Sequence, residues 1–445
     1  MRELPGKSSR LQTLNAPIAF LLTLALCYLI PTLFSHALGS ATIAIHLVLT
    51  GWMLWHWRWG QHEPTQQQFQ QLLLTGIVAR AILLFVPGFT THDVERYLWD
   101  GAVVLSGLDP YTVAPNDAVV SQLRELWPTP AEHAAYPTLY PPLALTMFAL
   151  CALAGPVWGI LLWKLVVTAA SIATLLIVAD LLKRAQQTRH LALIALSPLM
   201  LLEVGIGAHL DAFSALAISG ALWACARARW WLVGVALGLG GCIKLLPIVA
   251  LGPLLFASPI NRWGAMIGGT LGSVTLIYGS AMAVGFRPIG TLGVFFDKWR
   301  NGSPINSLLE WSLPAINHTQ ITVPIAVLAV CYALHRSRKD LKAGLLLILA
   351  TPLLLSPVVF SWYLLVLVPL FALRPNLFLL LWLTTVPLAY EVLNQFATTG
   401  EWSPASWPLW VIAGGWLVGL LADRHGFSSY TASHHPAGST NRYHH

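Results

Sequence analysis

The apolar run at residues 157–182, VWGILLWKLVVTAASIATLLIVADLL, decides the fold class. It contains only two charged residues, Lys164 and Asp180, and it is followed at once by Lys183 and Arg184. A helix of about 20 predominantly apolar residues is long enough to cross the hydrocarbon core of a bilayer. The run therefore predicts a transmembrane helix that ends in a basic cluster.

The rest of the chain has the same character. Of its 445 residues, 56% are hydrophobic and 10% are charged, whereas roughly 25% are charged in an ordinary soluble protein. The mean hydropathy is +0.67. These values exclude a disordered chain, a secreted disulfide scaffold and a conventional cytosolic enzyme. The net charge of +7 is spread over short clusters between apolar runs, so it does not indicate a nucleic-acid partner.

Hydropathy predicts an all-α polytopic membrane protein with about 14 transmembrane helices. The predicted spans are 17–37, 41–57, 71–89, 157–182, 191–208, 212–226, 231–243, 245–257, 263–285, 319–335, 341–360, 362–373, 376–396 and 406–422. Residues 1–422 are thus expected to form one transmembrane domain, and the polar, histidine-rich residues 423–445 a disordered cytoplasmic tail. A signal peptide is the alternative for 17–37, but a second apolar run follows directly.

The basic residues assign a direction to this topology. With 14 spans, 17 of the 25 lysines and arginines fall on the side of the two termini. Five fall on the opposite side, namely Arg96, Arg124, Arg287, Lys298 and Arg300. Cytoplasmic loops carry the excess of basic residues. The acidic loop 90–139, which holds seven of the 18 acidic residues, is therefore predicted to face outward.

The segment 140–155 follows this outer loop and is apolar but short. It begins at Tyr140-Pro141-Pro142 and ends near Gly155-Pro156, which leaves fewer residues than a crossing needs. We therefore expect a re-entrant or interfacial helix at 140–155. If it crossed the membrane, the basic cluster after 157–182 would lie outside, against the charge distribution.

The outer loop opens with the richest polar segment, Thr91-His-Asp-Val-Glu-Arg-Tyr-Leu-Trp-Asp-Gly101. In a helix, Asp93, Arg96, Tyr97 and Asp100 occupy positions i, i+3, i+4 and i+7, so they share one face. Val94, Leu98 and Leu105 line another face, which suits a helix on the membrane surface. The alternative is a structural role, in which Arg96 bridges two carboxylates and holds the loop.

Further isolated polar groups lie at the outward ends of other apolar runs. His209 and Asp211 lie between two predicted spans, Lys244 interrupts an apolar stretch, and Trp362-Tyr363 lies at another outward turn. A structural role is the simpler interpretation of each one alone. Because polar groups at membrane depth are expensive and all of these lie on one side, they indicate a shared cavity at the outer surface.

These residues resemble a known family in their order along the chain. Asp93-x-x-Arg96-Tyr97-x-Trp99-Asp100-Gly101 and Gly107-x-Asp109-Pro110-Tyr111 resemble the first outer loop of membrane glycosyltransferases with the GT-C fold. Bacterial polyprenyl-phosphate-mannose-dependent alpha-mannosyltransferases are the most similar. The resemblance continues to about residue 365 through Tyr140-Pro141-Pro142, His209-x-Asp211, Lys244-Leu245-Leu246-Pro247, Asn301-Gly302-Ser303 and Trp362-Tyr363.

The resemblance implies an inverting hexosyltransferase of the cell (inner) membrane with its active site on the extracytoplasmic side. It would move a hexose, with mannose expected, from a polyprenyl-phosphate donor within the membrane lipid to a glycan or glycolipid acceptor. Asp93 would be the general base. The expected substrate-binding residues are Arg96, Tyr97, Asp100, Tyr140, His209, Asp211, Lys244, Lys298, Arg300, Trp362 and Tyr363.

Two features of the expected site remain open at this stage. The departing lipid phosphate needs a cation, for which Lys298, Arg300 and Lys244 are the candidates. The sequence establishes no cofactor, and Asp93 and Glu95 form a D-x-E pair that is able to bind a divalent ion such as Mg²⁺ or Mn²⁺. A secondary transporter or flippase of lipid-linked sugars is the rival function, since broken helices and intramembrane charge also suit one.

Cysteine labelling tests the predicted topology. A Ser121→Cys variant without the five native cysteines should react with a membrane-impermeant maleimide on intact cells, because 90–139 is predicted to lie outside. Labelling that requires permeabilised cells would place this loop inside and overturn the topology.

Overall fold

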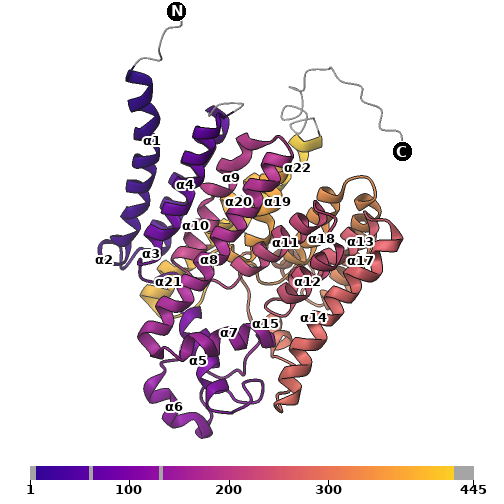
Figure 1. Cartoon of the computed structure of the whole chain (residues 1–445). Coiled ribbons are helices and arrows are strands. Elements are labelled where there is room, and N and C mark those ends of the chain that lie inside the picture. The colour runs from indigo at the N-terminus through magenta and orange to yellow at the C-terminus, as the bar shows by residue number, and fades with distance from the viewer. Residues whose placement is uncertain (1–6, 60–63, 130–133, 425–445) are drawn as a thin grey trace, which may run out of the picture.

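The computed structural model describes residues 7–59, 64–129 and 134–424, and most of these residues are helical (Figure 1). The long helices are α1 (Lys7–Ala25), α3 (Leu38–Trp59), α4 (Gln66–Leu83), α8 (Gly155–Arg184), α14 (Trp263–Ala283), α17 (Thr319–Ser337), α18 (Leu341–Leu355) and α22 (Trp407–Arg424). Shorter ones are α5 (Asp93–Leu105), α6 (Ser121–Leu126), α7 (Pro142–Ala152), α9 (Ala192–Ala195), α10 (Pro198–Gly205), α11 (Ala212–Cys225), α12 (Trp230–Gly241), α13 (Leu251–Phe256), α15 (Leu292–Lys298), α16 (Pro304–Ser312), α19 (Val368–Leu373), α20 (Leu377–Thr385) and α21 (Val392–Thr399).

The described residues contain six helical stretches that are long and apolar enough to cross a membrane: Leu38–Trp59, Gly155–Arg184, Thr188–Gly205, Ile260–Ala283, Thr319–Ser337 and Leu377–Thr399. They support the predicted polytopic membrane protein. Most of the other predicted spans correspond to shorter apolar helices, so the count of 14 stays a prediction.

Prolines explain several departures from the predicted spans. The first was predicted at 17–37, but α1 ends at Ala25, and a 3₁₀ turn and the short α2 (Ile30–Leu33), which contains Pro31, follow. The span predicted at 191–208 is likewise broken into α9 and α10 at Ser197-Pro198. A proline lacks the N–H of a continuous helix and disfavours helical geometry in the residue before it.

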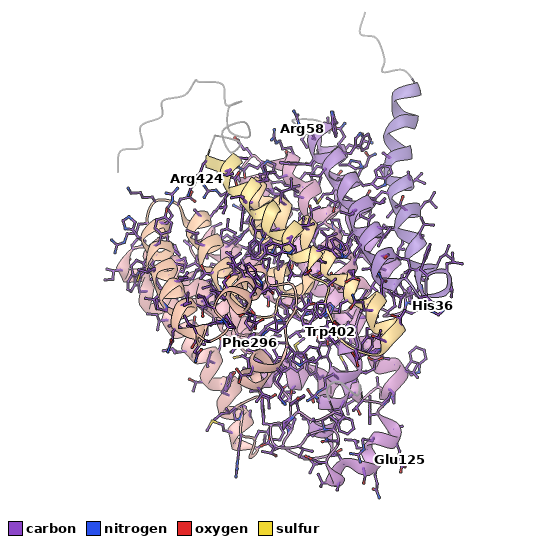
Figure 2. All side chains as sticks on the ribbon, turned by 180° about the vertical axis from the view of Figure 1, so that it is seen from behind. His36, Arg58, Glu125, Phe296, Trp402 and Arg424 are labelled. Carbon is purple, nitrogen blue, oxygen red and sulfur yellow. The ribbon has the colours of Figure 1, made fainter. Side chains whose placement is uncertain are left out.

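The two ends of the molecule differ in what they carry. Arg58 and Arg424, both predicted to be cytoplasmic, lie at one end, and Glu125 of the 90–139 segment lies at the other (Figure 2). Helices α5, α6 and α7 also lie at the Glu125 end (Figure 1). Of the predicted tail, Asp423 and Arg424 instead belong to α22, where the Asp423 carboxylate accepts backbone N–H groups at the start of α20. Residues 425–445 lie outside the described part.

The predicted helix in 91–101 is confirmed as α5, but the apolar face expected to contact lipid packs largely against protein. Residues 96–103 are all buried. Leu98, expected on a lipid-facing side, is 2% exposed and lies against Gly159 of α8. The exposed part of α5 is its C-terminal end, where Leu105 is 47% exposed. Helix α5 is therefore an internal element, packed between α7 and α8.

Helix α7 has 11 residues. At 1.5 Å per residue it spans about 16 Å, roughly half of the 30 Å hydrocarbon core. That length suits the re-entrant or interfacial helix predicted at 140–155, which stays a prediction.

The contact between α5 and α7 depends on Gly101. A Cβ at this position would lie 2.4 Å from the Phe148 carbonyl of α7, so the two backbones approach as only glycine allows. Gly101→Ala should lower stability by about 1–3 kcal/mol, the usual effect of overpacking. The measurement is the thermal melt of the purified protein in detergent.

Gly268→Ala on α14 is the matched control, because no described atom lies within 4 Å of a Cβ added there. Its melting temperature should stay the same or rise slightly, since alanine is the better helix former. Equal losses in the two variants would contradict the packing argument.

Candidate active site

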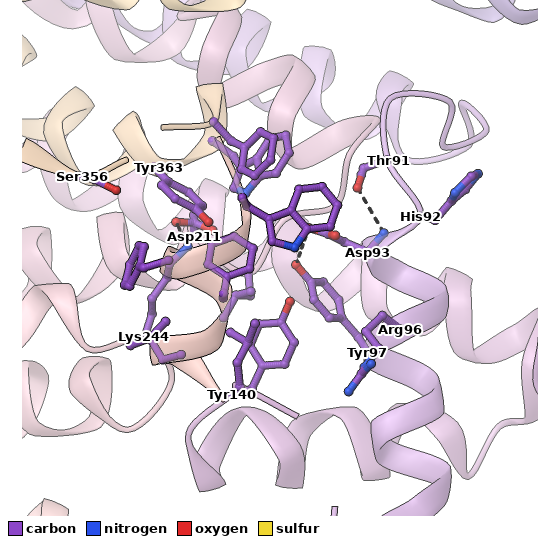
Figure 3. Close-up of a pocket in the computed structure, with 18 of the residues that line it drawn as sticks. Thr91, His92, Asp93, Arg96, Tyr97, Tyr140, Asp211, Lys244, Ser356 and Tyr363 are labelled. Atoms are coloured by element: carbon purple, nitrogen blue, oxygen red, sulfur yellow. Dashed lines mark hydrogen bonds and ion pairs between the residues drawn. The ribbon is translucent and has the colours of Figure 1, made fainter. Parts of the chain in front are cut away.

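A cavity of about 660 Å³ collects most of the polar groups singled out in the sequence. They reach it from six places: the start of α5, the turn before α7, the turn between α10 and α11, the segment after α12, the end of α15, and the 3₁₀ helix Ser361–Leu367. Figure 3 shows Asp93, Tyr97, Tyr140, Asp211 and Lys244 around a common space. Most of these side chains lie near the beginning or the end of a helix, where the backbone turns.

Asp93 is the first residue of α5, and its carboxylate lies at the cavity wall. Its backbone N–H donates to Thr91 Oγ1 at 3.1 Å, which fixes the start of the helix (Figure 3). The Tyr97 hydroxyl donates to Asp93 Oδ2 at 3.3 Å, and His209 Nδ1 lies 3.3 Å from the same oxygen. The Asp93 side chain is 17% exposed, so it is held in place and still reachable from the cavity.

Tyr97 stays a hydrogen-bond donor to this carboxylate. Burial raises the pKa of the Tyr97 hydroxyl well above its usual value, and the Asp93 carboxylate raises it further. The Tyr97 ring stacks on that of Phe148, with ring centres 4.6 Å apart, and meets the Tyr140 ring edge-on, with ring centres 5.2 Å apart. The ring is therefore locked with its hydroxyl toward Asp93.

Arg96 and Asp100 hold the outer loop. Arg96 Nε donates to Asp100 Oδ1 at 3.0 Å, and its Nη2 donates to the Tyr136 carbonyl at 2.9 Å. The Thr138 hydroxyl donates to Asp100 Oδ2 at 2.7 Å. Both ends of the 90–139 segment are thus tied together below the cavity. Arg96 lines the cavity, whereas Asp100 is buried and does not.

The three candidate cations have different partners. Lys244 Nζ lies 2.6 Å from Asp211 Oδ1 and 4.1 Å from the centre of the Tyr363 ring. Lys298 donates to the Tyr136 hydroxyl at 2.9 Å, and no described carboxylate lies within ion-pair distance of it. The charge of Lys244 is therefore balanced by Asp211. Among the described residues, no carboxylate balances the charge of Lys298.

Arg300 turns away from the cavity. Its Nε lies 2.5 Å from Glu310 Oε1, and its Nη1 donates to backbone carbonyls at the end of α15. It does not line the cavity. The Arg300 guanidinium thus satisfies free backbone carbonyls at the end of α15.

His209 is fully buried behind the cavity wall. Its ring stacks on that of Trp362, with ring centres 3.8 Å apart and planes 11° apart. Nine of the twelve residues predicted for the site line the cavity, and Asp100, His209 and Arg300 do not. The nine are Asp93, Arg96, Tyr97, Tyr140, Asp211, Lys244, Lys298, Trp362 and Tyr363.

Three buried polar residues next to this site are not among those predicted from the sequence, namely Glu203, His46 and Tyr390. Glu203 of α10 is 1% exposed, and it accepts a hydrogen bond of 2.7 Å from the Tyr390 hydroxyl. His46 Nε2 of α3 lies 3.5 Å from the other oxygen of Glu203. Glu203 and His46 lie inside predicted spans, where a polar residue is itself a signal of function.

The described residues contain no group of three or more histidine, cysteine, aspartate or glutamate side chains able to hold a metal ion. The Asp93 and Glu95 pair is therefore not part of such a group among the residues that the structure describes.

Comparisons with known proteins agree on one family. A family model described as "Alpha-(1->6)-mannopyranosyltransferase, N-terminal domain" matches residues 24–258, slightly more than half of the chain. A curated protein of Mycolicibacterium smegmatis, named as a probable alpha-(1->6)-mannopyranosyltransferase, is 25% identical over 407 residues. That alignment covers 76% of this chain and 71% of the relative. No solved structure matches.

Proposed function

Because the chain belongs to the alpha-(1->6)-mannopyranosyltransferase family and carries several membrane-length helices, it is a membrane mannosyltransferase, and we propose how it works. It takes mannose from a polyprenyl-phosphate donor and passes it to a hydroxyl of a glycan or glycolipid at the outer face of the cell membrane. The observation that carries this proposal is the Asp93 carboxylate, fixed at the wall of a large cavity that also exposes Lys298 and apolar side chains.

The donor would lie along the α15 side of the cavity. Lys298 ends α15, and Leu292, Phe295 and Phe296 of the same helix also line the cavity. A phosphate needs a positive charge, and an isoprenoid chain needs apolar surface. Lys298 beside these side chains offers both, and Lys244 is already paired with Asp211.

The acceptor would react at Asp93. The acceptor oxygen forms a bond to the anomeric carbon from the face opposite the phosphate, and its proton moves to the Asp93 carboxylate. The bond from the anomeric carbon to the phosphate oxygen breaks, and that oxygen keeps the electron pair. The leaving polyprenyl phosphate gains one negative charge, which Lys298 stabilises. The configuration at the anomeric carbon is inverted.

Transfer of label tests this function directly. Purified protein in liposomes is incubated with radiolabelled polyprenyl-phosphate mannose and a mannose-containing glycolipid. The proposal expects label in the acceptor and free polyprenyl phosphate. Label that crosses the bilayer still attached to its lipid would instead support a transporter, and no change of any kind would indicate a non-catalytic subunit.

Asp93→Asn should lower turnover per folded molecule by about 10² to 10⁴, the usual loss of general-base assistance. Asparagine keeps the shape of the side chain but is not a base. The measurement is initial rate in the transfer assay, with the folded fraction taken from thermal melts.

Asp117→Asn is the matched control for Asp93→Asn. Asp117 lies in the same loop, accepts the Ala114 N–H at 2.8 Å and does not line the cavity. Its turnover should stay near that of the unaltered protein. The base assignment is wrong if the two variants lose turnover equally, or if neither does.

Lys298→Gln should raise KM for the donor by about 10- to 100-fold, because hydrogen bonds to charged groups contribute roughly 1.5–3 kcal/mol. Lys298→Arg should keep most of the affinity. Arg300→Gln should leave KM nearly unchanged, since Arg300 pairs with Glu310. If KM for the donor rises more in Arg300→Gln than in Lys298→Gln, the phosphate-binding cation is Arg300 and the assignment to Lys298 is wrong.

A further inference from the structure

A chain of buried polar contacts connects the cavity with the interior of the helix bundle. It begins at Asp93, passes through His209 and reaches Glu203, which also contacts His46 and Tyr390. His209 Nε2 lies 3.6 Å from Glu203 Oε2, and His209 Nδ1 lies 3.3 Å from Asp93 Oδ2. The two ring nitrogens of one histidine thus face two different carboxylates. Only Asp93 among these five residues lines the cavity.

Backbone contacts around residues 207–209 keep His209 in this position. The His209 backbone N–H donates to the Glu203 carbonyl at 3.1 Å, so the turn after α10 closes on the helix that carries Glu203. Trp163 Nε1 donates to the Ala208 carbonyl at 2.8 Å. A Cβ at Gly207 would lie 2.4 Å from His209 Nε2, so the ring fits only because residue 207 is glycine.

The ring plane of His209 is fixed as well. Trp362, in the 3₁₀ helix Ser361–Leu367, stacks on the ring, and the His209 side chain has no exposed surface. An imidazole held at its backbone and in its plane, with a carboxylate oxygen within 3.6 Å of each nitrogen, has little freedom to rotate. The Asp93 oxygen that it faces therefore has a fixed neighbour.

We propose that Glu203 is a positioning residue for Asp93 and acts through His209. The proposal rests on the function proposed above, in which Asp93 is the base. A carboxylate can only accept hydrogen bonds, so a ring nitrogen that carries a hydrogen is its natural partner. Glu203 anchors Nε2, the ring presents Nδ1 to Asp93, and the Asp93 carboxylate is kept turned toward the cavity.

A purely structural role explains Glu203 less well. A neutral glutamine would accept the Tyr390 hydroxyl equally well and would avoid the burial of a charge in an apolar bundle. The carboxylate is instead surrounded by two histidines and one hydroxyl donor, and the contacts of one histidine reach the cavity. Other ionisable groups around Asp93 and His209 include Tyr97, Tyr140, Asp211, Lys244 and Tyr363.

The expected effect is on the rate and not on donor binding. A misplacement of a reacting group by about 1 Å costs up to roughly 10²-fold in rate. Glu203→Gln should therefore lower kcat by about 10- to 100-fold. KM for the donor should stay within about twofold, because the donor phosphate is assigned to Lys298.

A double-variant cycle separates positioning from general destabilisation. If Glu203 acts through Asp93, then Glu203→Gln should cost nothing more in the Asp93→Asn background, because the carboxylate that it positions is already gone. If the two losses multiply, Glu203 acts independently of Asp93 and the inference is overturned. A Glu203→Gln variant with unchanged kcat overturns it equally.

Two further variants complete the test. Glu203→Asp keeps the charge and should recover part of the kcat lost in Glu203→Gln, and no recovery would count against the inference. If Glu203→Gln fails to fold, Tyr390→Phe replaces it in the cycle, since it removes one donor to Glu203 and keeps the ring. Asp180→Asn, which breaks ion pairs with Arg184 and Arg227, is the control and should leave kcat unchanged.

Failure of the cycle is distinguishable from failure of the proposed function. If Asp93→Asn alone retains full turnover, then Asp93 is not the base, and the proposed mechanism is wrong together with the inference. If Asp93→Asn loses turnover and Glu203→Gln loses the same factor in both backgrounds, the mechanism stands and the positioning role is wrong.

Discussion

Inside a bilayer, the protein itself must satisfy every buried polar group of the backbone, and this constraint shapes the whole molecule. Broken helices leave free carbonyls at membrane depth. Arg80 of α4 donates to the carbonyls of Ile194 and Ala195 at the end of α9, and Lys164 of α8 contacts the carbonyls of Leu83 and Val86 after α4. Two cations that could have belonged to a site thus stabilise helix ends instead.

Because these breaks are stabilised, the chain can turn inside the bundle and place side chains at one cavity. Asp93 begins α5, Asp211 precedes α11, Lys244 follows α12 and Trp362 lies in the first turn of a 3₁₀ helix. A continuous helix would point only some of these side chains inward, at 3.6-residue intervals. The site is therefore a consequence of interrupted helices, with a polar centre and apolar walls that suit a lipid-linked sugar.

The sequence predicted the membrane class, the helix at 93–105 and the gathering of nine residues at one cavity, because these depend on local hydropathy and spacing. It could not predict that α5 is internal, since Leu98 looks the same against lipid as against Gly159. It could not choose between Lys298 and Arg300 either. They differ through Glu310, whose contact with Arg300 depends on how the chain folds back after α15. Glu203 and His46 were hidden because a hydropathy average over a span conceals one polar residue.

The two carboxylates linked by His209 have opposite needs, and their burial reflects this. In the proposed mechanism the base must meet the acceptor, and 17% of the Asp93 side chain is exposed. The proposed anchor, Glu203, is 1% exposed, with Tyr390 as a hydrogen-bond donor and one histidine nitrogen within 3.6 Å of each of its oxygens. In the proposed arrangement, the rigid imidazole of His209 lets the buried Glu203 fix the orientation of Asp93 at the surface of the cavity.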